Sequence, residues 1–186
     1  MAIDRCEGGA TGILETAATT FLLLIATRWF HAGATAKAII ASGGSLGLLL
    51  SPLVVTWAEA SRLPVARAAS LVLAAGAVSF AVMTLFPVLP IFVAFGLIAM
   101  ACSSAAIPLM TQVYQMNYPP EERGRLFSKA MVVRIGMAAL ANELGGRLLA
   151  VHLDYFRALL LFFAAAFAFG AWCQYVSYRT TSPTPG

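Results

Sequence analysis

The sequence predicts an all-α fold, a polytopic membrane helix bundle with six transmembrane helices. Of its 186 residues, 60% are hydrophobic and only 11% are charged, whereas soluble domains carry roughly 25% charged residues. Apolar stretches of about 20 residues, which is the length that crosses ~30 Å of hydrocarbon as a helix, recur along the chain. Because lipid cannot satisfy backbone N–H and C=O groups, these stretches are expected to be helices. They lack the alternation of barrel strands.

The expected spans follow one another with short connections and together form one bundle over residues 1–178. They cover residues 9–30, 36–58, 66–86, 90–115, 128–151 and 156–176. The longest connection, 116–127, is expected to contain a short interfacial helix that starts after its two prolines. The polar, proline-rich tail at 179–186 is predicted to be disordered.

The basic residues indicate how the bundle is oriented. One set of connections contains Arg5, Arg62, Arg67, Arg123, Arg125, Lys129 and Arg179, and the other contains only Arg28, Lys37 and Arg157. Positive charge collects on the cytoplasmic side of membrane proteins. The sequence therefore predicts an integral protein of a cell membrane, plasma or inner, with both termini in the cytoplasm. Because no single amphipathic face gathers the basic residues, nucleic acid is not expected as a partner.

The residues that bind metals and cofactors are few and scattered. Cys6, Cys102 and Cys173 form neither a CxxC motif nor a Cys/His cluster with metal spacing. A glycine-rich phosphate loop is also missing from the sequence. We therefore predict no metal and no cofactor, and no activity driven by bound nucleotide.

Charged residues inside the expected spans are the first candidates for function, because each costs ~2.5–3.5 kcal/mol at a helix centre. Glu143 and Arg147 stand four residues apart on the fifth span, so they can form an intramembrane ion pair on one helix face. One interpretation is a structural pair that lowers the cost of insertion. The other is that Glu143, with Asn142, faces a water-filled cavity and handles substrate or protons.

Two further polar residues are candidates for the same cavity. Glu15 lies on the threonine-rich first span, either facing a cavity or near enough to the cytoplasmic surface to stay hydrated. Gln112 lies on the fourth span, one turn after Pro108, which removes a backbone hydrogen bond. The expected substrate-cavity residues are therefore Glu15, Gln112, Asn142 and Glu143.

The second span contains a stripe of small residues, Gly43, Gly47 and Ser51, at four-residue spacing. Such stripes let two helices approach closely. The segment 43–47 also matches the G-x-S-x-G pattern of a serine hydrolase, with Ser45 as nucleophile. That motif needs a strand-to-helix turn, and both histidines are predicted near the outer surface, so an intramembrane serine hydrolase is only a remote alternative and no enzyme is predicted.

Three segments carry a resemblance to a known family. The segment Tyr118-Pro119-Pro120-Glu121-Glu122-Arg123-Gly124-Arg125, with its Arg-Gly-Arg motif, is followed by Asn142-Glu143-Leu144-Gly145-Gly146 and Asp154-Tyr155-Phe156-Arg157-Ala158-Leu159. Their order resembles the N-terminal six-helix half of the major facilitator superfamily (MFS). Of the signature between spans two and three in that family, only Arg62 and Arg67 carry over.

The resemblance implies a secondary transporter that moves a small solute by alternating access. Family members have two six-helix halves with the substrate site between them, so this chain supplies one half of such a site. A second six-helix half or a second copy of the chain is then the expected partner, within a lipid bilayer. The cytoplasmic loop arginines are expected to contact anionic lipid heads. The alternative is a non-transport membrane scaffold or assembly subunit whose intramembrane charges pair with a partner protein.

Overall fold

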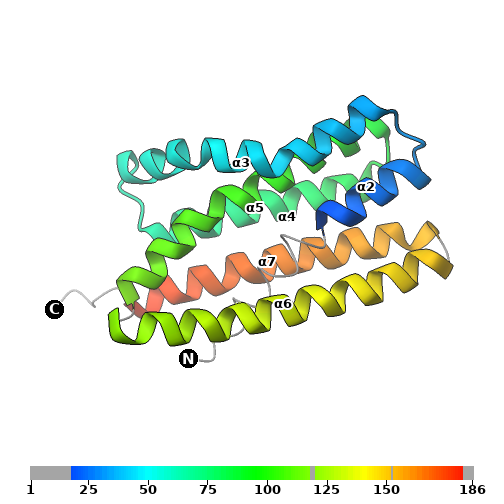
Figure 1. The fold of residues 1–186 in the computed structure, drawn as a ribbon. Helices are drawn as coiled ribbons and strands as arrows, with labels where there is room; N and C mark the ends of the chain where they lie inside the picture. The colour runs from blue at the N-terminus through cyan, green and yellow to red at the C-terminus, as the bar shows by residue number, and fades with distance from the viewer. Residues whose placement is uncertain (1–17, 118–119, 152, 182–186) are drawn as a thin grey trace.

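The computed structural model describes residues 18–117, 120–151 and 153–181. Within them the chain is all helical (Figure 1), which confirms the predicted all-α class. The elements are α2 (Ala18–Arg28), α3 (Ala34–Ala60), α4 (Val65–Leu85), α5 (Leu89–Asn117), α6 (Pro120–Val151), the 3-10 helix η2 (Leu153–Tyr155) and α7 (Phe156–Thr181).

Four of these helices are long and apolar enough to cross a membrane. They are α3, α4, α5 over Leu89–Val113 and α7 over Phe156–Val176. The described part of α2 is apolar but short, and the first half of the expected span 9–30 lies outside the described residues. Helix α6 is long, but its charged residues set it apart from the apolar four. The structure is thus compatible with a membrane protein and leaves the six-span count as a prediction.

Two boundaries differ from the sequence prediction. Helix α6 begins at Pro120 and continues without a break to Val151, so the segment expected to form a separate interfacial helix is the first part of α6. Proline is favourable at the first helical position, and in the turns that follow only Gly124 weakens the helix, by about 1 kcal/mol. Helix α7 extends to Thr181, into the segment expected to be a disordered tail.

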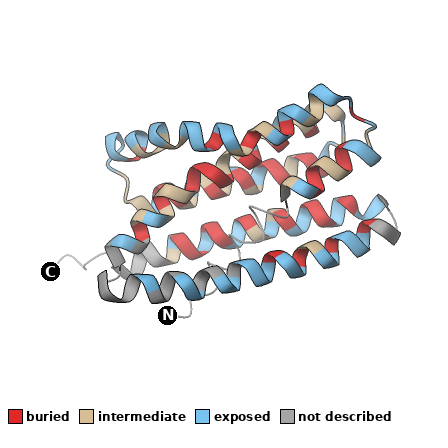
Figure 2. Ribbon diagram, viewed as in Figure 1, coloured by how far each residue is buried: buried red, intermediate tan, exposed pale blue. Residues whose placement is uncertain are grey.

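Helix α4 lies at the centre of the bundle. It packs against α5 on one side and α7 on the other, while α3 packs along α5 and α2 meets α3 and α5. Helix α6 runs along the outer edge of the bundle (Figure 1) and contacts α5 and η2, the elements that flank it in the chain. The two outer helices, α3 and α6, present broad exposed faces (Figure 2).

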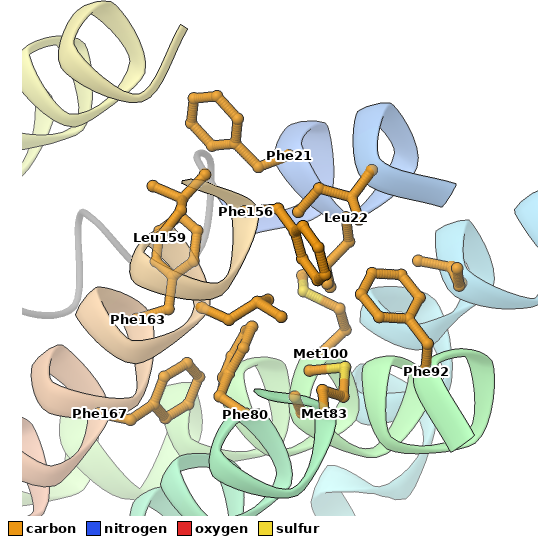
Figure 3. Close-up of a cluster of buried hydrophobic side chains, with 14 of the residues drawn as sticks. Phe21, Leu22, Phe80, Met83, Phe92, Met100, Phe156, Leu159, Phe163 and Phe167 are labelled. Carbon is orange, nitrogen blue, oxygen red and sulfur yellow. The ribbon is translucent and has the colours of Figure 1, made fainter. Parts of the chain in front are cut away.

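Aromatic rings fill the core where α2, α4 and α7 meet (Figure 3). The ring of Phe80 lies 5.6 Å from that of Phe163 and 5.3 Å from that of Phe167, centroid to centroid. Phe21 of α2 joins them with its ring 6.0 Å from that of Phe163. Tilted rings at these separations attract each other beyond their hydrophobic burial. This cluster ties the first, third and last described helices together.

Glycines bring α3 close to α5. A Cβ atom placed on Gly43 would lie 2.7 Å from the Cβ of Met100, and one placed on Gly47 would meet the backbone of Ala101. Only a residue without a side chain fits at such distances. The close approach predicted from the small-residue stripe is therefore present at both glycines. The third member, Ser51, has a different role.

Ser51 compensates for a proline inside α3. Pro52 has no N–H to donate to the carbonyl of Leu48, four residues earlier. The hydroxyl of Ser51 donates to that Leu48 oxygen at 2.7 Å. Hydrocarbon offers no water to an orphaned carbonyl, so this bond would satisfy the Leu48 carbonyl if α3 spans a membrane.

Exposed tryptophan and tyrosine residues lie near the ends of the helices. Trp29 and Tyr155 are close to the α2–α3 and α6–α7 connections, while Trp57, Trp172 and Tyr175 lie toward the opposite end of the bundle. Figure 1 shows these two connections at one end of the molecule, and the end of α3 and the start of α6 at the other. Such aromatic belts are typical of the two membrane–water interfaces.

Candidate functional site on helix α6

Helix α6 has a buried face that points into the bundle. Ala138, Ala141, Gly145 and Leu149 are buried and recur every three or four residues, which places them on one side of the helix. A Cβ atom on Gly145 would lie 2.6 Å from Cζ of Phe21. The inner face of α6 therefore meets Phe21 of α2 at Gly145, where the absence of a side chain allows the ring to lie against the backbone.

The opposite face of α6 carries the predicted ion pair. Nη2 of Arg147 lies 2.6 Å from Oε1 of Glu143, and Nε of Arg147 donates to the same oxygen at 2.7 Å. The side chain of Arg147 is 77% exposed and that of Glu143 is 63% exposed. Glu143 follows buried Ala141 by two residues, which is about 200° around the helix. The pair therefore faces away from the bundle.

The charged pair continues a seam along that outer face. Val132, Gly136 and Leu140 are exposed and precede the pair at spacings of four, four and three residues, and Arg147 follows Glu143 by four. These spacings are those of a helix seam that packs against another helix. A Cβ atom on Gly136 would meet no described atom within 4 Å.

The other predicted cavity residues do not gather around this pair. Asn142 lies on the same helix and is half-buried, at the edge of the inner face, and Glu15 lies outside the described residues. Gln112 is half-buried on α5, five residues before the end that connects to α6. Asn142 lies about 33 Å along α6 from that connection at 1.5 Å per residue. The structure thus places Gln112 and Asn142 at different depths.

The arginines of the predicted cytoplasmic loop motif belong to the α3–α4 region and to the start of α6. Both lie at the end of the bundle opposite the α6–α7 connection (Figure 1). Arg62 and Arg67 are exposed, and Arg62 adopts a left-handed φ of 52° just after α3. There the N–H of Leu63 donates to the carbonyl of Ala58 at 3.1 Å, which closes the helix in a Schellman motif. Arg62 therefore occupies a position where glycine is usual.

The remaining three members of the predicted loop motif are part of a helix. Arg123, Gly124 and Arg125 lie in the first two turns of α6 rather than in a connecting loop. The sequence prediction places them in a cytoplasmic connection, with a short interfacial helix after the two prolines. In the structure, the second of those prolines starts the helix.

Hydroxyl groups in the spans are mostly satisfied by their own helices. Thr111 donates to Ile107, Ser79 to Ala75 and Thr84 to Phe80, in each case to the carbonyl one turn earlier at 2.8–2.9 Å. Such bonds are internal to a helix and need no partner from a cavity. The hydroxyl of Thr111 on α5, next to Gln112, therefore has a structural role.

Two polar features where α4 meets α7 were not predicted from the sequence. Ser70 donates to the carbonyl of Ala171 at 2.8 Å, and the side chain of Gln174 is fully buried one turn further along α7. The one signal for Gln174 in the sequence is an amide within an otherwise apolar span. Interhelical hydrogen bonds such as that of Ser70 stabilise membrane bundles by ~0.6–2 kcal/mol.

Ser45, the residue of the hydrolase alternative, lies on the exposed side of the continuous helix α3. The strand-to-helix turn of a nucleophile elbow is not formed at this position. Among the described residues, no group of three or more His, Cys, Asp or Glu side chains is placed to hold a metal ion.

No protein-family model, curated protein or solved structure matches the chain.

Proposed function

We propose that this chain is a six-helix half of a secondary transporter of the major facilitator type, which moves a small solute across a cell membrane by alternating access. The observation that carries the proposal is the Glu143–Arg147 pair on α6. Ionisable residues inside a membrane segment are costly and mark substrate or ion pathways by default. The resemblance of the segments 118–125 and 142–146 to the family adds support.

In this proposal the solute path lies between this half and its partner, beside the outer face of α6. Glu143 lies eight residues before the end of α6, about 12 Å from Val151, and so close to the middle of a ~30 Å hydrocarbon layer. A carboxylate at that depth binds a cation or a proton. Asn142 would then contribute hydrogen bonds at nearly the same depth as Glu143, and Gln112 at another depth of the path.

The proposed orientation places both termini in the cytoplasm. The exposed Arg62 and Arg67 lie at the end of the bundle where α6 begins, and Arg28 and Arg157 lie at the other end. With the first end in the cytoplasm, the excess of positive charge lies inside. Fusing a fluorescent protein or alkaline phosphatase to the C-terminus tests this: fluorescence without phosphatase activity is expected.

Transport is tested with the purified chain in proteoliposomes under an imposed proton gradient. The probes are labelled sugars, labelled amino acids and the cationic dye ethidium. We expect uptake of at least one probe above empty vesicles, and a roughly tenfold or greater loss with Glu143→Gln. Glu59→Gln, a change at an exposed carboxylate at the end of α3, is the matched control and should keep the wild-type rate. No uptake of any probe by folded wild-type protein would count against transport.

The alternative function is a membrane scaffold or assembly subunit. The observation that favours it is that the ion pair faces outward instead of into the described bundle. In that case Glu143→Gln lowers assembly with a partner protein, while vesicles show no flux for either form.

A further inference from the structure

The outer face of α6 poses a physical problem if the helix crosses a membrane. Glu143 and Arg147 are exposed there between Leu140, Leu144 and Leu148, which are exposed as well. A guanidinium has five N–H donors, and its contacts with Glu143 occupy only part of them. Hydrocarbon has no hydrogen-bond acceptor for the remaining N–H groups of Arg147.

The exposed face of α3 shows what lipid alone requires. Its exposed residues include Leu46, Leu49 and Leu53, and the only charges on that helix are Lys37 and Glu59 near its two ends. Such a surface suits acyl chains as it stands. The face of α6 differs because its charges lie about 6 and 12 Å inside the helix end.

From this difference we infer that the seam Val132–Gly136–Leu140–Glu143–Arg147 of α6 packs against the same seam of a second copy of this chain. The inference rests on the proposed placement of α6 in the membrane, not on transport. A symmetric dimer brings one patch against itself, so the patch must be self-complementary. A seam that carries one acid and one base meets that condition.

The charge bias of the connections determines the relative direction of the two copies. Both copies insert with the same orientation, so their α6 helices run parallel and the two Glu143 side chains lie at one depth. Each Arg147 lies one turn away, about 6 Å along the axis. Its long side chain bridges Glu143 of its own copy and Glu143 of the second copy. The two carboxylates and the two guanidinium groups then alternate around the symmetry axis.

The rest of the seam fits a close helix pair. Gly136 is open on its outer side and allows the two backbones to approach, as Gly43 and Gly47 do between α3 and α5. A hollow of about 420 Å³ lined by Ser128, Lys129, Val132 and Val133 continues the face toward the start of the helix. It offers room for apolar side chains of the partner.

Charge exchange between two tagged copies tests the inference. Glu143→Arg gives a seam with two cations, and Arg147→Glu gives one with two anions. We expect each variant to lose self-association in detergent roughly tenfold relative to wild type. Mixing the two variants should restore co-purification to within about twofold of wild type. Failure of the mixture to recover, with both variants helical and monodisperse, overturns the inference.

Cysteine cross-linking in native membranes gives a second readout that needs no charge change. In a chain without its own cysteines, Leu140→Cys and Leu144→Cys should form disulfide-linked dimers with copper phenanthroline. Leu49→Cys on α3 is the matched control, since that side chain is equally accessible at 73% exposure. Equal cross-linking at all three positions, or cross-linking of the α6 cysteines only to another protein, contradicts a specific pair of copies. Flux is not measured in either experiment, so transport can fail while the dimer stands.

Discussion

Helices α3 and α6 both lie at the outside of the bundle, yet their exposed faces differ in chemistry. Each approaches a neighbour through glycine, α3 at Gly47 and α6 at Gly145. The exposed face of α3 is apolar over its central turns, whereas that of α6 carries Glu143 and Arg147. The comparison teaches that exposure in an isolated chain has two meanings in a membrane. An apolar face is complete against lipid, and a charged one calls for a polar partner.

The largest expected effect comes from filling the α3–α5 contact. Gly47→Leu places a side chain against the backbone of Ala101, which cannot move aside. We expect the free energy of unfolding to fall by about 3 kcal/mol, measured by circular dichroism during titration with sodium dodecyl sulfate. Gly146→Leu on α6, where a Cβ meets nothing described within 4 Å, should cause no loss and should raise stability by up to about 1 kcal/mol, because leucine favours the helix more than glycine does. A similar loss in both variants would remove the distinction between the packed and open glycines.

The charge difference between the two helices should appear in membrane insertion. Segment 34–60 is expected to insert almost completely when placed between glycosylation sites in microsomes, and segment 128–151 only partly. Replacing both Glu143 and Arg147 with leucine should favour insertion of the second segment by about 2–3 kcal/mol in apparent free energy. If unmodified α6 inserts as well as α3, the ion pair already neutralises its own cost and the comparison loses its basis.

An added side chain should destabilise the protein less at Gly145, on the inner face of α6, than at Gly47, where α3 meets α5. Gly145→Leu meets the Phe21 ring rather than a backbone, and a ring can shift. We expect a loss of about 2 kcal/mol in the free energy of unfolding, less than for Gly47→Leu in the same titration. The double variant Gly145→Leu with Phe21→Ala tests the assignment, because the smaller side chain should return part of that loss. No coupling between the two positions would show that α6 does not rest on Phe21.

The smallest effect is expected at the proline of α3. Ser51→Ala removes the hydroxyl that satisfies the Leu48 carbonyl, for which Pro52 has no N–H, and should cost about 1 kcal/mol. Ser42→Ala is a matched control, because Ser42 makes the same bond to the carbonyl of Ile39 at 2.8 Å without a following proline. That carbonyl retains its helical donor, so the control should be nearly neutral. Equal costs would show that the hydroxyl of Ser51 does not compensate for the proline.

Much of the fold was predictable because membrane helices are determined by local composition. The spans at 36–58, 66–86, 90–115 and 156–176 correspond to α3, α4, α5 and α7. The close approach at Gly43 and Gly47 was also predictable, since small residues at four-residue spacing are typical of helices whose backbones pack closely. A helix start at the two prolines was expected, since proline is favourable at the first helical position. It was expected as a separate interfacial helix, because the charged residues at 121–125 divide this segment from the apolar span that follows, whereas the structure has one continuous helix.

The candidate site was predictable only in part, because a sequence assigns residues to spans but not to depths and directions. Gln112 and Asn142 form one polar set in the sequence and lie at different levels along the bundle. Spacing alone indicated that Glu143 and Arg147 share a face. Which way that face points depends on tertiary contacts, here the burial of Ala141 and Gly145 against the core.

The unequal lengths of the helices have a consequence for the bilayer itself. Helix α4 has 21 residues and is about 32 Å long, whereas α5 has 29 residues and is about 44 Å long. A bundle that fits α4 therefore leaves α5 to tilt or to project into the headgroups. In thicker membranes the ends of α4 would be drawn into hydrocarbon, and the short connection that follows Ala60 would go with them. In a membrane, the central helix would thus set the bilayer thickness at which the protein is least strained, and hydrophobic mismatch would become a means of sorting it.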